Sequence, residues 1–141
     1  MSTGDRGSVS LEMAILAPVL ILLVVIGIVA GRTVLAANAV ADAAHAAARA
    51  ASLDRDPVSA RADAAQIADT TLANSGRRCI RQTTTTDTSG FAVPIGQPAS
   101  VSVTVTCRIS YADLSAVPGV PGGRTFSATF TSPLDQYRER S

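Results

Sequence analysis

The chain has 141 residues, of which 47% are hydrophobic but only 4% aromatic, so little of its apolar content can form a large globular core. Eleven acidic residues balance twelve Arg to a net charge of +1, without the basic blocks typical of nucleic-acid-binding proteins. One His, two Cys and no Lys supply few catalytic side chains. We therefore expect a structural protein rather than an enzyme, with no nucleic acid, small-molecule substrate, cofactor or metal.

The first predicted element is a membrane-spanning helix over the uncharged run from Met13 to Gly31. At about 1.5 Å per residue, this run approaches the roughly 30 Å thickness of a bilayer's hydrocarbon core. The alternative is a secretory signal peptide, whose apolar core is shorter and follows a basic segment. Here only Arg6 precedes the run, beside Asp5.

Two features of this helix indicate that it packs against another helix. Glu12 stands at the edge of the apolar run, where a charge is unfavourable, by roughly 2.5–3.5 kcal/mol at the centre of a membrane helix. It either has a partner charge or extends to the membrane surface. Gly27 and Gly31 have the spacing that lets a second helix approach closely, although glycine is also simply tolerated in such helices.

The helical pattern continues without Gly or Pro from Arg32 to Leu53. Its polar residues recur every three or four positions and share one stripe: Asn38, Asp42, His45, Arg49 and Ser52. The remaining surface is rich in Ala and must be buried, against the protein's own head or against a partner. His45 could pair with Asp42, but no nucleophile lies nearby in sequence, so we assign His45 no catalytic role.

A second helix is predicted from Pro57 to Asn74, ending at Gly76 and folding back on the first. Asp56 has the position of an N-cap and Pro57 that of the first helical residue. Asp54 and Asp56 could instead hold a metal ion, but capping already explains Asp56.

The remaining chain shows the alternation of β-strands. Three strands are expected, over Cys79–Thr86, Ala99–Ser110 and Arg124–Thr131, with an exposed loop at Val117–Gly123 that is rich in Pro and Gly. The strand of residues 99–110 places its valines and Cys107 on one face. The expected fold is α+β, with a long N-terminal helix, a second helix and a small antiparallel sheet.

Cys79 and Cys107 form a pair that we expect to be a disulfide, because an even number of Cys in a small extracytoplasmic domain is usually bonded. The alternative is two buried free thiols. A disulfide favours a single-pass protein of the cell membrane, with a cytoplasmic N-terminus and an extracytoplasmic head. The charges flanking the membrane helix are too balanced to fix this orientation.

The N-terminus resembles type IV prepilins in the spacing of Gly7, Ser8 and Glu12. The string from Arg6 to Pro18, with Pro six residues after Glu12, is similar to TadE-like proteins of the tight-adherence (Flp) pilus system. The segments 27–32 and 48–51 share this similarity, and so, more loosely, does the C-terminal stretch 132–138. Major Flp pilins are shorter and carry Tyr after the Glu, so the resemblance is to minor pilins or pseudopilins.

This resemblance implies a mechanism. A prepilin peptidase would cut between Gly7 and Ser8, and Glu12 would then pair with the new Ser8 amine of a neighbouring subunit. Other pilin-like subunits and the Tad assembly platform would be the partners, in pilus assembly and adhesion. The implied regions are a leader, 1–7, a long helix, 8–53, a linker and second helix, 54–76, and a β-rich head, 77–141.

An alternative function also fits the sequence. In this second interpretation the protein is an uncleaved, membrane-anchored binding module, whose β head recognises a component of the cell envelope. The two interpretations differ in the processing of the N-terminus and in the need for the Glu12 carboxylate.

Overall fold

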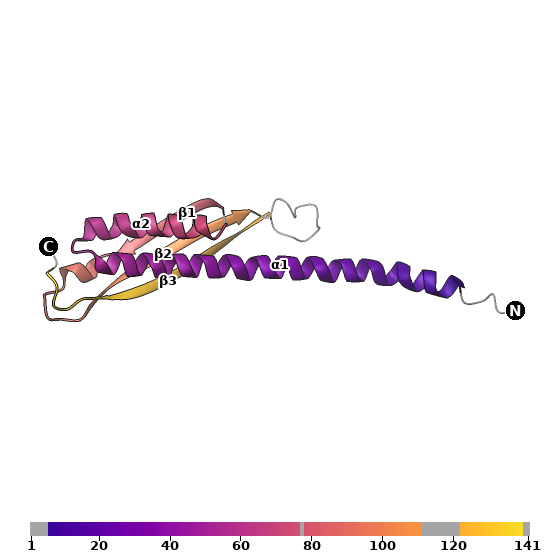
Figure 1. Cartoon of the computed structure of the whole chain (residues 1–141), viewed down its shortest axis with the longest axis horizontal. Helices are drawn as coiled ribbons and strands as arrows, with labels where there is room; N and C mark the ends of the chain where they lie inside the picture. Colours follow the sequence, from indigo (N-terminus) through magenta and orange to yellow (C-terminus); the bar gives the residue numbers. More distant parts are fainter. Residues whose placement is uncertain (1–5, 77, 111–121, 140–141) are drawn as a thin grey trace. The chain divides into compact units, whose positions relative to one another are not determined.

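The computed structural model describes residues 6–76, 78–110 and 122–139. Its elements follow the order α1, α2, β1, η1, β2 and β3, which is an α+β fold as the sequence predicts (Figure 1). The chain divides into two compact units, residues 1–35 and residues 36–141, which we describe separately. Most of the loop predicted at Val117–Gly123 lies outside the described residues, as does most of the predicted leader.

The N-terminal unit consists of the first part of α1 (Arg6–Leu53), which begins two residues before the predicted start at Ser8. Large apolar side chains are exposed along it; Ile21, for example, is 65% exposed. Exposure of so many apolar groups is unfavourable in water but suits hydrocarbon. From Glu12 onward, α1 is long and apolar enough to cross a membrane.

In the second unit, α2 (Pro57–Asn74) has the predicted bounds. The Asp56 side chain accepts hydrogen bonds from the backbone N–H groups of Val58 and Ser59, both at 2.9 Å, and so caps the helix. At the other end, Gly76 adopts φ +69°, the left-handed conformation that favours glycine just after a helix. Local sequence signals therefore set both ends of α2.

The sheet contains β1 (Cys79–Asp87), β2 (Ala99–Ser110) and β3 (Gly123–Leu134), antiparallel and in that order. The bounds of β2 match the prediction, whereas β3 continues three residues beyond the predicted end at Thr131. A short 3-10 helix, η1 (Ser89–Ala92), follows β1 and was not predicted. The sheet's described edges are thus β1 and β3.

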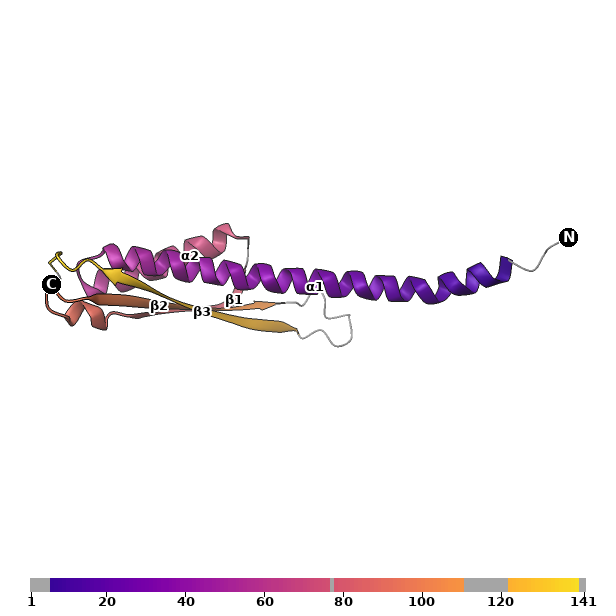
Figure 2. The ribbon, with the colours of Figure 1, turned by 90° about the horizontal axis from the view of Figure 1, so that it is seen from below.

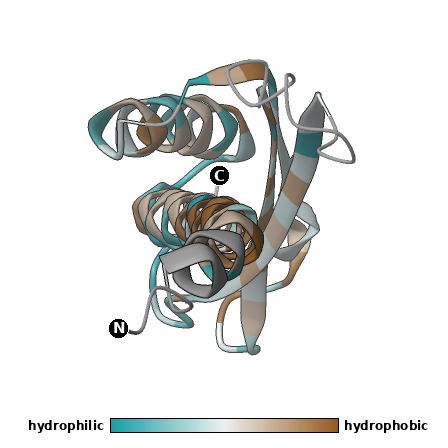
Figure 3. Cartoon of the chain, turned by 90° about the vertical axis from the view of Figure 1, so that its right-hand side faces the viewer, coloured by the Kyte–Doolittle hydropathy of each residue, from teal (hydrophilic) through white to brown (hydrophobic). Residues whose placement is uncertain are grey.

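The core of the head lies between the sheet and the helices, which cover one face of it (Figure 2). Viewed end-on, α2 forms a layer beside the sheet (Figure 3). The strand β2 contributes Val101, Val103, Val105 and Cys107, all fully buried. Facing them, the helices contribute mostly alanines, so the helix backbones pack close to the sheet. These alanines are Ala36, Ala39, Ala43, Ala44, Ala47, Ala48, Ala51, Ala60, Ala64 and Ala68.

The protein's own head therefore covers the Ala-rich face of α1. Of the two alternatives that the sequence leaves open, burial against the head or against a partner, the structure shows the first.

Candidate assembly residues

The predicted processing site lies in the first turns of α1. Gly7 and Ser8 are in helical backbone, and Glu12, four residues after Ser8, has an exposed side chain. A spacing of four residues places two positions on the same side of a helix, about one turn apart. Cleavage at Gly7–Ser8 and pairing by Glu12 stay predictions.

Gly27 and Gly31 present an open surface on the apolar first part of α1. A Cβ atom added to either glycine would meet nothing within 4 Å among the described residues. The two glycines lie one turn apart, so together they form a shallow area on one side of α1. A second helix could approach there, and this role also stays a prediction.

The polar stripe of α1 faces away from the core of the head. Asn38, Asp42, His45 and Arg49 are exposed, and Ser52 is half-buried. The His45 ring packs edge-on against Phe130 of β3, with 4.3 Å between ring centroids and 73° between the planes. Sequence periodicity identified the stripe, but it could not identify the contact with Phe130, which depends on the placement of β3.

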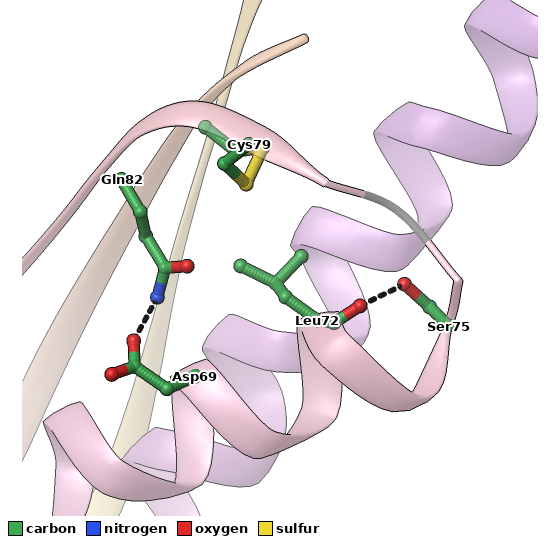
Figure 4. The surroundings of a disulfide bond; sticks show 6 residues. Asp69, Leu72, Ser75, Cys79 and Gln82 are labelled. Carbon is green, nitrogen blue, oxygen red and sulfur yellow. Dashed lines mark hydrogen bonds between the residues drawn. A yellow bond between two sulfur atoms is a disulfide. The ribbon is translucent and has the colours of Figure 1, made fainter.

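The disulfide between Cys79 and Cys107 is confirmed, with an S–S distance of 2.00 Å and a Cα–Cα distance of 5.4 Å (Figure 4). It joins β1 to β2 beside a register irregularity between Cys79 and Arg81. The Leu72 side chain of α2, 1% exposed, lies close by. On the same side, the Gln82 side chain donates a hydrogen bond to Asp69 of α2. The disulfide thus ties β1 to β2, and the Gln82–Asp69 hydrogen bond ties β1 to α2.

The two carboxylates of the helix–helix turn have different surroundings. Burial raises the pKa of Asp54, helped by the nearby charges of Asp63 and Asp56, while Arg138 acts in the opposite direction. Hydrogen bonds from Ser59 hold the pKa of Asp56 below its usual range. Within the described residues, no group of three His, Cys, Asp or Glu side chains could hold a metal ion. Capping thus accounts for Asp56.

A cavity of about 570 Å³ opens at the start of α2, between Pro57 and Arg61 on one side and Asp87, Thr88 and Phe91 on the other. The Arg61 guanidinium Nη2 donates a 2.6 Å hydrogen bond to the buried Thr88 hydroxyl. Both residues line the cavity, so this hydrogen bond links two parts of its lining. Sequence analysis missed this cavity, because η1 forms part of it and carries no periodic signal.

The outer face of the sheet is a surface of hydroxyl groups. Three pairs bridge β2 and β3: Ser102 with Thr131 at 2.7 Å, Thr104 with Thr129 at 2.8 Å and Thr106 with Ser127 at 3.0 Å. Cross-strand pairs of this kind stabilise an antiparallel sheet modestly. The hydroxyl groups thus hydrogen-bond to one another across the two strands. The alternation of polar and apolar residues along the strand is the sequence signal that places these hydroxyl groups on the outer face.

Comparison with known proteins identifies the N-terminal segment. Residues 7–49 match the family model described as TadE-like protein. No curated protein and no solved structure matches the chain. The matched segment contains Gly7, Ser8 and Glu12, the glycine pair Gly27 and Gly31, and most of the polar stripe. The resemblance inferred from the sequence is therefore confirmed over residues 7–49: the chain carries a TadE-like N-terminal segment, typical of proteins associated with the Tad pilus.

Proposed function

We propose that this protein is a minor pilin or pseudopilin that acts in assembly of a Flp-type (Tad) pilus and in the adhesion that the pilus provides. The observation that supports this role is the TadE-like segment, which has Gly7, Ser8 and Glu12 at the start of an apolar helix. The role is structural and non-enzymatic.

The first step is cleavage by a membrane prepilin peptidase. Hydrolysis of the Gly7–Ser8 amide leaves a carboxylate on Gly7 and a new amine on Ser8, which is protonated near neutral pH. The absence of a side chain on Gly7 lets the chain enter a narrow site. Because helix ends fray, the first turn of α1 can open for this step.

The second step is pairing between subunits. An unpaired Glu12 carboxylate at the membrane edge is unfavourable, and so is an unpaired Ser8 ammonium group. When two helices pack side by side, the carboxylate of one subunit can meet the ammonium group of the next, so each compensates the other. Cleavage would thus create the partner charge that Glu12 requires.

The proposed topology is a single-pass anchor with a cytoplasmic N-terminus and an extracytoplasmic head. The disulfide supports this orientation, because such bonds persist in oxidising compartments. Other pilin-like subunits and the Tad assembly platform would be the partners.

The alternative is an uncleaved anchor that carries a binding head. Its supporting observation is the open cavity beside Arg61 and Phe91, which offers both a charged and an apolar contact. In that protein, Glu12 would extend to the membrane surface and would have no role in assembly.

Replacing Glu12 by Gln tests the proposal. E12Q should insert normally into the membrane, as measured by resistance to alkaline extraction, but should no longer copurify with pilin-like subunits. The matched control is E139Q, which removes the same charge from the exposed C-terminal segment and should assemble normally. Normal assembly of E12Q would favour the uncleaved anchor.

A further inference from the structure

We propose that the outer edge of β3 binds an extended segment of a different protein, which adds a fourth strand to the sheet. The segment alternates apolar residues with Ser or Thr and carries no charge where it pairs with β3. This inference goes beyond the proposed function, because it concerns the head and holds whether or not the N-terminus is processed.

The first observation is that β3 has a free edge. Within the described residues, β3 has one neighbouring strand, β2, and pairs with it without a shift in register from Gly123 to Leu134. In a strand that pairs on one side only, the backbone N–H and C=O groups of alternate residues point away from the sheet. No backbone hydrogen bond joins β3 to a described element other than β2. A further extended strand is the partner that matches such a row of donors and acceptors.

The second observation is that the two edges of the sheet differ in protection. Proteins guard exposed strand edges with charged side chains, bulges or a covering element. The strand β1 has a register irregularity between Cys79 and Arg81, and it carries exposed charges at Arg81 and Asp87. In β3, residues 125–132 contain no charge, no Pro and no register shift. An uncharged edge of this kind is prone to aggregation unless a partner covers it.

The side chains of β3 define the chemistry of the added strand. On the inner face, Phe130 is 40% exposed and Phe126 is half-buried against the core. Apolar side chains on a neighbouring strand would cover both rings and extend the core. On the outer face, Ser127, Thr129 and Thr131 pair with hydroxyl groups of β2. Ser or Thr on the added strand would continue this pattern.

A second copy of this chain fits the edge poorly. The strands run along the head part of α1 (Figure 2), so in the proposed topology β3 points in the same direction in every copy. Two β3 edges can then pair only in parallel, about a two-fold axis along the strands. This axis turns one sheet over, so Phe130 of one copy would lie beside hydroxyl groups of the other. Pairing of β3 with β1 of another copy would meet the irregularity and the charges of β1.

Amide hydrogen exchange of the full-length chain in detergent tests strand addition. The probe is a short peptide of alternating Val and Thr with a Glu at each end. It should slow exchange several-fold at alternate residues within 125–132, because the added strand accepts hydrogen bonds from their outward N–H groups. The amides of β1 should not change. The control peptide, in which Pro replaces the Val residues, should give no protection, because Pro has no N–H to donate.

Charge placed on the edge tests where the peptide binds. T129K should weaken peptide binding several-fold, because an added strand would lie against the new charge. T85K is the matched control, since Thr85 and Thr129 are both exposed and both lie beside Thr104, but at opposite edges of the sheet. T85K should bind the peptide as the native chain does. If the urea midpoint shows that T129K does not fold, S127K with T83K as its control makes the same comparison.

A photoreactive amino acid in place of Thr129 identifies the occupant in the native membrane. An adduct should form with a different protein, and mass spectrometry should map the contact to an uncharged segment that alternates apolar residues with Ser or Thr. The same amino acid in place of Thr85 should give no such adduct. An adduct between two copies, a contact with a segment that lacks this alternation, or no adduct would overturn the inference. So would unchanged binding by T129K, or protection that is absent or equal at β1 and β3.

Failure of this inference is distinguishable from failure of the proposed function. Loss of assembly in E12Q, together with absence of protection at β3, would reject only strand addition. Protection of β3 in a chain whose N-terminus stays uncleaved would support strand addition while rejecting processing.

Discussion

Asp54 and Asp56, two carboxylates in the turn between the helices, are two residues apart yet contribute oppositely to stability. The pKa of Asp54 is higher in the folded state than in the unfolded state. Ionised Asp54 therefore destabilises the fold, and this destabilisation decreases as the pH falls through the folded-state pKa. For Asp56, whose pKa is lowered, the contribution is favourable above the unfolded value and is lost as the pH falls through the folded-state pKa.

Replacing Asp54 by Asn should therefore stabilise the protein at pH 7. One oxygen of its side chain, Oδ2, is buried without a hydrogen bond among the described residues, and the neighbouring acids disfavour its charge. The gain in urea midpoint should shrink as the pH falls through the raised folded-state pKa, and it should be lost below about 3.9, the ordinary pKa of Asp, where the side chain is protonated in both the folded and the unfolded state. A gain that does not change with pH would contradict this account.

At the scale of elements, the head depends on close approach of its Ala-rich helices to the sheet. Ala47 of α1 is 0% exposed within the core cluster, whereas Ala41, on the same helix, is exposed. The small side chains leave no room for larger ones without movement of the helix. Tight packing, rather than hydrophobic bulk, is thus what holds α1 in place.

Ala47→Leu should destabilise the head by about 1–3 kcal/mol through overpacking. Ala41→Leu adds the same atoms to an exposed site and should leave the free energy of unfolding nearly unchanged. Urea unfolding of both variants in detergent gives the comparison. Similar stabilities for the two would show that α1 is not packed as described.

The disulfide is the second element-scale constraint. Replacing Cys79 and Cys107 together by Ala should lower the free energy of unfolding by about 2–5 kcal/mol, the usual cost of removing a native disulfide from a small domain. Adding a reductant should destabilise the native chain but not the double variant. An unchanged urea midpoint after reduction of the native chain would contradict a stabilising bond.

The elements that the sequence predicted well are those with strong local signals. The alternation of β2 defines both its ends, and Asp56 and Gly76 define those of α2. The prediction for β3 ended too early because Ser132, Pro133 and Leu134 break the alternation, yet pairing with β2 extends the strand to Leu134. The helix η1 carries no periodic signal of its own.

At the scale of the whole molecule, some features of the candidate site depend on local sequence and others depend on the fold. The spacing of Gly7, Ser8 and Glu12 is a feature of local sequence, and the family match covers it. The contact of His45 with Phe130 joins residues far apart in the chain, and no local pattern could reveal it. Sequence therefore identified the candidate processing site and the stripe, while the fold was needed to show how the stripe is presented.

The central claim is that cleavage before Ser8 creates the charge that Glu12 meets in a neighbouring subunit. Intact mass measurement of the protein extracted from its native membrane tests this claim most directly. We predict loss of residues 1–7 and a mature N-terminus at Ser8, in a product that depends on the prepilin peptidase. An intact N-terminus in protein that still assembles with other pilin-like subunits would contradict the account.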